Sequence, residues 1–459
     1  MLKKGFASVA LALVYALAYV MPLAFLLFFL EKTNFQVLTL SRTSVIMSTS
    51  FVILMYVFSR IYGGFRIGQQ KSRPIIYQMS LAVLFTDIIL YLQLQIMNVN
   101  EANNDTLELF TVDLLLLAAA LVLQIVFIIA LTYLGNYIYF SVRPPKKCCV
   151  ITANKKDMRA ICNKVGIFRK QFIINECVEC TDPDLHAKIK ANETIILFHL
   201  PAKVHQELIA YCYKCQKDIY YDLSVPDVLT QKSGSFLLDD VMMTAHTRYG
   251  LSPFDRFLKR TLDLVLSSVG LIVLSPLMLI VAIAIKLDDG GSIFYRQDRM
   301  TRGDQVFRIY KFRTMREDAG AKEYSVVQDD DRITRVGAFL RKYRIDELPQ
   351  LINILKGEMS VVGPRPEMLT NFNKYLEDLP EYAYRCQVKA GLTGYAQISG
   401  KYNTTPRDKL MMDISYIEGY SFWLDIKLIL KTLTVFFRHD STEAFESAPA
   451  DDPEEQPDD

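Results

Sequence analysis

The sequence lacks several features that would narrow its function. It has no small-residue cleavage site after its first apolar run, so residues 1–31 are predicted to be a retained membrane anchor and not a removed signal peptide. It has almost no excess charge, because 52 Lys and Arg residues balance 50 Asp and Glu residues and leave a net charge of +2. It also has no G-x-G-x-x-G segment, the glycine pattern of a dinucleotide-binding turn. These absences count against a secreted protein and against a dinucleotide site.

What the sequence does have is an unusual amount of apolar residues for its charge. Hydrophobic residues make up 51% of the 459 positions, while 22% are charged. This combination predicts membrane segments beside ordinary globular parts, and the length predicts two or three domains.

The first 146 residues are predicted to form a four-helix transmembrane module. Four apolar runs each come close to or exceed the ~20 residues that span a bilayer. They are Phe6–Leu30, Thr43–Ser59, Ile75–Met97 and Leu109–Phe140. Lys and Arg flank the module at both ends and between the second and third runs, whereas residues 98–108 contain none. The positive-inside rule then places both ends of the module in the cytoplasm.

A few polar side chains interrupt these apolar runs. They are Asp87, Gln93, Gln95 and Asp113. They suggest either a transport pathway or contacts between helices, and helix contacts or interface solvation explain them better because most lie near helix ends.

Residues 147–250 are predicted to form a Rossmann-like α/β module without a glycine loop. Strands are expected at Cys148–Thr152, Gln171–Asn175, Thr194–Leu200 and Asp218–Leu223. Helices are expected at Lys155–Val165 and Lys203–Gln216. This alternation indicates a parallel, doubly wound sheet. Without the glycine pattern we expect a structural or regulatory role for it.

All eight cysteines fall in segments predicted to be cytoplasmic, so free thiols are expected. Two C-x-x-C pairs, Cys177/Cys180 and Cys212/Cys215, raise the alternative of a four-thiolate zinc site. The long interval between the pairs and the helical position of the second favour buried thiols.

A fifth apolar run, Leu262–Leu287, precedes the last part of the chain. Ser275 and Pro276 lie at its middle, where proline removes a helix hydrogen bond and produces a kink. Basic residues flank both ends of the run, which predicts a re-entrant helix that returns to the cytoplasmic face. The alternative is a proline-kinked fifth span, which would place everything after it outside the cell.

Two adjacent carboxylates, Asp346 and Glu347, mark the candidate site. Adjacent acids repel each other, so they are commonly held by a cation or a metal. Arg341 precedes the pair and Arg365 follows it in a Gly-Pro-Arg-Pro turn that two prolines stiffen. These charges suggest a site that handles anions; the alternative is an ordinary solvated surface.

A strand is predicted at Tyr310–Met315, where alternation places Lys311 and Arg313 on one face as phosphate partners. The turn-rich loop Gly391–Gln397 offers amide and hydroxyl donors, with Thr393 and Gln397 as candidates for a nucleotide or sugar site. Residues 420–439 suit either a helix in the headgroup plane or a core helix.

The segment from Phe254 to Phe437 resembles the bacterial sugar transferase family, also called monotopic phosphoglycosyl transferases. The matching motifs occur in the family's order. They are Lys259-Arg260 with Asp263, Ser275-Pro276, Tyr310–Met315, the run Asp346 to Leu351, Gly363–Pro366 and Gly391–Gln397. Tyr395 stands where Trp is frequent and Ser399 where Asn is frequent, and both differences could affect sugar choice.

The resemblance implies a membrane protein with an α/β catalytic head at residues 251–446, followed by an acidic tail at 447–459 that is expected to be disordered. It implies transfer of a hexose-1-phosphate from a UDP-sugar to undecaprenyl phosphate, with release of UMP, at the cytoplasmic face of the bacterial inner membrane. It further implies Mg²⁺ held by Asp346 or Glu347, with Asp346 as the carboxylate nucleophile. Arg341, Arg365, Lys311 and Arg313 would hold phosphate oxygens.

Other function classes remain open at this point. A non-catalytic scaffold or regulator of polysaccharide assembly would release no UMP, and a transporter would need more polar residues inside the first four helices. Nucleic-acid binding is not expected, because the apolar anchor points to phosphate substrates at a membrane. Glucose or galactose is the expected sugar, with N-acetylhexosamines as the alternative, and a homodimer is an open expectation.

Overall fold

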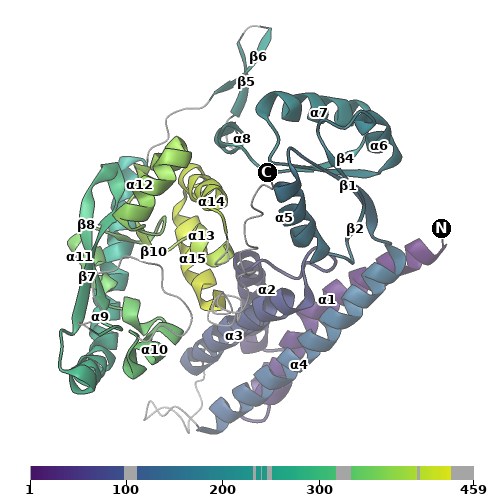
Figure 1. Cartoon of the computed structure of the whole chain (residues 1–459). Helices are drawn as coiled ribbons and strands as arrows, with labels where there is room; N and C mark the ends of the chain where they lie inside the picture. Colours follow the sequence, from purple (N-terminus) through teal and green to yellow (C-terminus); the bar gives the residue numbers. More distant parts are fainter. Residues whose placement is uncertain are drawn as a thin grey trace. The chain divides into compact units, whose positions relative to one another are not determined.

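Figure 1 shows the protein as a computed structural model, which describes residues 2–97, 111–230, 234–238, 240–245, 251–316, 332–400 and 404–435. The predicted acidic tail lies outside the described residues. The chain forms two compact units, Met1–Asp222 and Leu223–Asp459. The predicted domain ranges 1–146, 147–250, 251–446 and 447–459 stay predictions.

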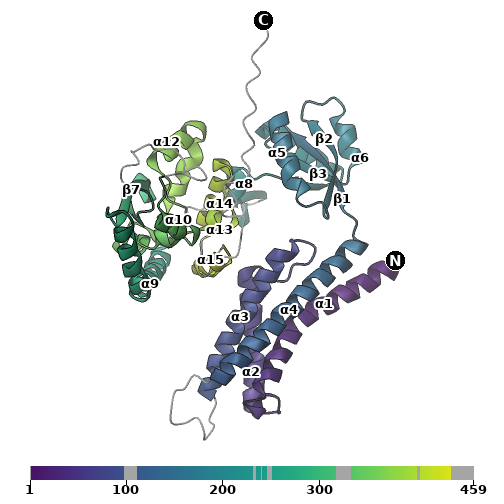
Figure 2. The ribbon, with the colours of Figure 1, turned by 60° about the horizontal axis from the view of Figure 1, so that its bottom comes forward.

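The first unit begins with four long helices at the four predicted apolar runs. They are α1 (Leu2–Leu30), α2 (Arg42–Tyr62), α3 (Ser72–Met97) and α4 (Thr111–Val142). Each is long and apolar enough to cross a membrane. Figure 2 shows α1 and α4 lying along each other, and α2 packs on α3. The protein is therefore a membrane protein.

Polar side chains within these helices bond to neighbouring helices. The Gln95 side-chain amide lies 3.2 Å from the Asp113 carboxylate, and Gln124 donates to the Pro22 carbonyl at 2.8 Å. These contacts agree with the helix-contact interpretation of Gln95 and Asp113.

The predicted parallel sheet is confirmed. Its strands are β1 (Lys146–Thr152), β2 (Phe172–Glu179), β3 (Thr194–Phe198) and β4 (Asp218–Tyr221), in the order β2-β1-β3-β4. All three pairings are parallel. The helices are α5 (Lys155–Gly166), α6 (Leu185–Ala191) and α7 (Ala202–Lys214). Helix α6, which has seven residues, is absent from the prediction.

All eight cysteines are free thiols. The Sγ atoms of Cys162 and Cys177 lie 3.1 Å apart, and Cys212 is buried in the sheet's core. Within the described ranges, no three His, Cys, Asp or Glu side chains gather as a metal site would require.

The second unit begins with α8 (Val225–Thr230), the antiparallel hairpin of β5 (Gly234–Leu238) and β6 (Val241–Ala245), and the long helix α9 (Pro253–Asp289). The antiparallel hairpin of β7 (Phe294–Met300) and β8 (Val306–Phe312) follows. Next come α10 (Arg335–Lys342), α11 (Gln350–Lys356) and β9 (Ser360–Val362), which pairs in parallel with β10 (Gly391–Thr393). The remaining helices are α12 (Leu369–Asp378), the 3₁₀ helix η5 (Pro380–Gln387), α13 (Tyr395–Ser399), α14 (Pro406–Glu418) and α15 (Phe422–Val435).

Helix α9 contains the fifth apolar run and is a further candidate span. The sequence predicts a kink at Ser275 and Pro276, and both residues lie inside α9, which spans 37 residues. Proline lacks the N–H that would bond to the Ile272 carbonyl four residues earlier. The Ser275 hydroxyl donates to that same carbonyl at 2.8 Å, so the freed acceptor keeps a partner.

Both halves of α9 pack on the compact head that follows it. Leu266, Leu271 and Leu274 pack on a core that contains Leu351 and Ile354 of α11. Val281 and Ile285, further along the helix, pack with Phe312 and Leu340. Most of the remaining apolar surface of α9 is exposed: only 11% of its most apolar stretch of 18 residues is buried.

Candidate active site

The acidic pair lies in a sharp turn between two helices. After α10 the chain passes through Arg344, which adopts the left-handed conformation at φ 54°, and enters the 3₁₀ helix η4 (Ile345–Glu347). Pro349 then caps the start of α11. Non-glycine residues rarely adopt positive φ values. This reversal places Asp346 and Glu347 at the junction of α10 and α11.

Two cations hold Glu347. The Lys311 Nζ and the Arg365 Nη2 each lie 3.0 Å from its Oε1 atom. Burial would raise the pKa of Glu347, but the nearby charges of Arg365 and Lys311 outweigh it and lower the pKa below its ordinary value. Glu347 is therefore ionised, and it brings together two of the four predicted phosphate-binding residues.

Asp346 is in a different electrostatic state. Among the described residues, none forms an ion pair with its carboxylate. Burial raises the pKa of Asp346, opposed by Lys311 and reinforced by Glu347. One acid of the pair is thus neutralised by two cations, while the other has no direct ion-pair partner among the described residues.

The other two predicted phosphate-binding residues bond to other groups of the fold. Arg341 donates through Nε to the Thr314 hydroxyl at 2.8 Å, and its charge acts on the pKa of Asp346. Arg313 is buried, and its Nε donates to the Ser292 carbonyl at 2.5 Å. Strand β8 ends at Phe312, and the Arg313 N–H still donates to the Ile293 carbonyl at 2.9 Å.

The loop residues Thr393 and Gln397 make contacts within the fold. The Thr393 hydroxyl lies 2.7 Å from that of Thr432, and Gln397 donates to the Leu392 carbonyl at 3.2 Å. The loop lies against the Gly-Pro-Arg-Pro turn, where the Gly363 N–H donates to the Thr393 carbonyl. A Cβ at Gly363 would come within 2.4 Å of the Lys389 carbonyl oxygen, so this close approach requires glycine.

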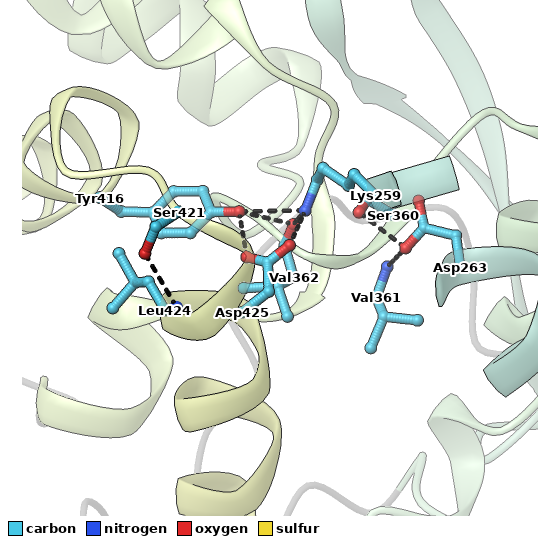
Figure 3. A network of polar contacts seen from close by, with 9 residues as sticks. All are labelled: Lys259, Asp263, Ser360, Val361, Val362, Tyr416, Ser421, Leu424 and Asp425. Carbon is cyan, nitrogen blue, oxygen red and sulfur yellow. Dashed lines mark hydrogen bonds and ion pairs between the residues drawn. The ribbon is translucent and has the colours of Figure 1, made fainter. Parts of the chain in front are cut away.

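Figure 3 shows a buried polar network that the sequence did not reveal. The Lys259 Nζ of α9 donates to Asp425 Oδ2 at 2.7 Å and to the Val362 carbonyl at 2.9 Å. The Tyr416 hydroxyl donates to the other oxygen of Asp425 at 2.8 Å. Lys259 and Asp425 are both buried. The network joins α9, α14 and α15 to the strand that leads into the turn carrying Arg365.

A second acid of α9 reinforces this attachment. Asp263 Oδ1 accepts from the Ser360 hydroxyl at 2.9 Å and from the Val361 N–H at 2.8 Å. Arg260 donates to the Ile354 and Leu355 carbonyls at the end of α11. The sequence signal was the presence of three charged side chains at the start of an apolar helix, since buried charges require partners.

The chemistry of the acidic pair fits a magnesium ion. Magnesium is commonly held by one or two carboxylates together with substrate phosphates and water. Asp346 offers a carboxylate without an ion-pair partner in the described part of the chain, and Glu347 follows it directly. The described residues contain no cluster of three or more His, Cys, Asp or Glu side chains that would form a closed protein cage.

Comparison with known proteins places this site in a family. Residues 254–439 match the family described as bacterial sugar transferase. The UDP-glucose:undecaprenyl-phosphate glucose-1-phosphate transferase of Caulobacter vibrioides is 44% identical over 182 residues, which cover 38% of this chain and 68% of that protein. The UDP-N-acetylgalactosamine-undecaprenyl-phosphate N-acetylgalactosaminephosphotransferase of Aeromonas hydrophila is 36% identical over 232 residues, covering 50% and 54%.

A third relative is the UDP-glucose:undecaprenyl-phosphate glucose-1-phosphate transferase of Escherichia coli, 39% identical over 192 residues, which cover 40% of this chain and 41% of the relative. The chain thus spans about half the length of the Aeromonas and Escherichia relatives, at 54% and 41%. The matched residues lie in the second unit and contain the acidic pair and the turn of Arg365. The chain therefore belongs to the bacterial sugar transferase family.

Proposed function

We propose that this enzyme transfers a hexose-1-phosphate from a UDP-sugar to undecaprenyl phosphate and releases UMP, as the first membrane step of polysaccharide assembly. The observation that carries the proposal is the unequal acidic pair. Glu347 is neutralised by Lys311 and Arg365, while Asp346 has no ion-pair partner in the described structure and is available to react. The names of three relatives, which act on UDP-sugars and undecaprenyl phosphate, support the same reaction.

The proposed reaction has two displacements at one phosphorus atom. An Asp346 oxygen attacks the β-phosphorus of the UDP-sugar, the bond from that phosphorus to the bridging oxygen breaks, and UMP leaves with the bridging oxygen. A phosphate oxygen of the lipid then attacks the aspartyl phosphosugar and releases the Asp346 carboxylate. Lys311 and Arg365 lie beside the acids and would bind the phosphate oxygens as negative charge develops.

Arg341 and Arg313 enter the proposal in different ways. Arg341 would steady the ionised Asp346 by its charge, consistent with its effect on the pKa of that group. Arg313, which bonds to the Ser292 carbonyl, would shape the end of β8 beside Lys311. Thr393 and Gln397 would hold the loop that supports the turn of Arg365.

Magnesium bound by Asp346 and Glu347 would neutralise the diphosphate and the leaving UMP. Chelation with EDTA is expected to stop UMP release, and added Mg²⁺ is expected to restore it. Ca²⁺ should restore it poorly, because it takes more ligands at longer distances. UMP release that persists in excess EDTA would contradict the magnesium requirement; thermal unfolding in EDTA is the control for damage to the fold.

We place the catalytic head at the cytoplasmic face of the bacterial inner membrane, with α9 re-entrant and not spanning. A span that crosses a ~30 Å hydrocarbon core could not pack both of its halves on one head. Both the Leu266–Leu274 part and the Val281–Ile285 part of α9 do so. The exposed outer side of α9 carries large apolar residues such as Val265, Val273 and Ile280, which suit contact with lipid and with the isoprenoid tail.

Glucose or galactose is the proposed sugar, with an N-acetylhexosamine as the alternative. Relatives named for glucose and for N-acetylgalactosamine both match, so neither sugar is favoured by them alone. We expect UMP release with undecaprenyl phosphate, Mg²⁺ and one member of a panel of UDP-sugars comprising glucose, galactose and their N-acetylated forms. The Asp346→Asn variant is the matched negative control.

The second candidate function is a non-catalytic membrane scaffold of polysaccharide assembly, supported by the sheet unit that has no glycine loop. It predicts no UMP release from any member of the panel.

A homodimer is proposed as the working assembly, and the molecular mass of the protein in detergent tests it.

A further inference from the structure

The turn that presents Arg365 is unusual in how it is held. Pro364 and Pro366 flank the arginine, and neither has a backbone N–H. The turn therefore has few backbone N–H donors of its own. The rest of the fold can fix it mainly through hydrogen bonds to its carbonyl groups. Of these carbonyls, that of Pro364 accepts from the Gly391 N–H at 2.8 Å.

Two arginines that no site prediction included bind the neighbouring carbonyls. Arg385 of η5 donates through Nη2 to the Arg365 carbonyl at 2.9 Å. Arg299 of β7 donates through Nη1 to the Pro366 carbonyl at 3.1 Å. Together with Lys259, which donates to the Val362 carbonyl at 2.9 Å, three side-chain cations from distant parts of the chain converge on this turn.

Arg385 is itself held firmly. Its side chain is 4% exposed, and its Nη2 lies 2.8 Å from an oxygen of Asp413, a side chain that is 1% exposed. A second carboxylate, Glu367, lies 3.6 Å from its Nη1, which also donates to the Tyr382 hydroxyl. Partners on α14, on η5 and just after the turn thus fix the guanidinium. Neutralising Asp413 would not by itself require a bond to the Arg365 carbonyl.

We propose that Arg385 is a positioning residue for Arg365, with Arg299 supporting the other side of the turn. Through the two carbonyls they fix the backbone of Arg365, and this fixes where its guanidinium meets Glu347 and the substrate diphosphate. The part that concerns the diphosphate rests on the proposed function. Arginine suits this task because its rigid fork holds the Tyr382 hydroxyl through Nη1 while Nη2 donates to the Arg365 carbonyl, whereas a lysine would have to reach both groups from one nitrogen.

A double-mutant cycle tests the proposal. The four proteins are the wild type, Arg385→Lys, Arg365→Gln and the double variant, each as the full chain in detergent or membranes. Arg385→Lys keeps the charge beside Asp413 but replaces the two terminal nitrogens, which serve Tyr382 and the Arg365 carbonyl separately, with a single nitrogen, so kcat is expected to fall by about tenfold to a hundredfold with KM nearly unchanged. In the Arg365→Gln background the same change is expected to have no further effect on kcat beyond about twofold.

An independent structural role for Arg385 gives a different pattern. Arg385→Lys would then lower kcat by the same factor in both backgrounds, and that result would overturn the proposal. Arg308→Lys is the matched control, because Arg308 lies on the β7–β8 hairpin with a side chain that is 72% exposed and pairs only with Asp298 among the described residues. It is expected to keep wild-type kinetics.

Two further measurements keep the test decisive. If Arg385→Lys does not fold, as judged by thermal unfolding, the cycle is repeated with Arg299→Lys. This change is expected to lower kcat in the wild type but to have no further effect on kcat in the Arg365→Gln background. If the wild type releases no UMP from any UDP-sugar, the proposed function fails. The cycle is then measured as UDP affinity by calorimetry, where equal losses in both backgrounds would overturn the positioning role.

Discussion

Replacing Asp346 with asparagine is expected to abolish UMP release, by roughly 10⁴-fold or more, which is the scale of loss when a catalytic nucleophile is removed. The amide has nearly the same shape as the carboxylate but is not a nucleophile at phosphorus. No described residue forms an ion pair with Asp346, so the substitution leaves no cation without its partner. We therefore expect the variant to fold and still to bind the UDP-sugar.

The measurement is a rapid-quench experiment with a UDP-sugar labelled in the sugar, in the absence of undecaprenyl phosphate. The wild type is expected to retain label on the protein and Asp346→Asn to retain none. Asp298→Asn is the control, because Asp298 is an exposed acid on the β7–β8 hairpin that pairs with Arg308. Robust turnover by Asp346→Asn would reject the nucleophile. An active wild type that never carries label would favour direct attack by the lipid phosphate.

Much of the fold could be predicted because hydropathy and strand–helix alternation are local properties. The four apolar runs became α1 to α4, and the run Cys148–Thr152 lies within β1. The seven-residue helix α6 was missed because it is too short to show a periodic pattern. Pro276 lies inside α9, and the Ser275 hydroxyl donates to the Ile272 carbonyl that proline leaves without a helix N–H.

The site was predictable as far as neighbouring charges indicate it. Asp346 and Glu347 are adjacent in sequence, and Arg365 stands in a recognisable turn. The burial of Arg313 and its bond to the Ser292 carbonyl could not be predicted in this way, because that partner lies 21 residues earlier in the chain. The partner of Lys259 is 166 residues away in the chain, so only tertiary structure reveals it.

The second large effect is expected from Lys259→Met. This change leaves Asp425 buried without its cation, and breaking a buried ion pair by removing one partner typically costs about 3–5 kcal/mol. The Lys259 Nζ lies 2.7 Å from Asp425, and the two side chains are 8% and 1% exposed. A large fall in the midpoint of thermal unfolding is expected. Lys286→Met, at the exposed end of α9, is the matched control and should change the midpoint little.

Removing both charges separates stability from catalysis. In Lys259→Met with Asp425→Leu no buried charge is left unpaired, so the unfolding midpoint is expected to recover most of its loss. Activity should recover less, because the Val362 carbonyl has still lost the Lys259 donor just before the turn of Arg365. Equal recovery of both properties would show that the network only stabilises the fold. A single variant as stable as the wild type would contradict the buried pair. If the expected split is found, the start of α9 both secures the head and helps to fix the phosphate-binding arginine.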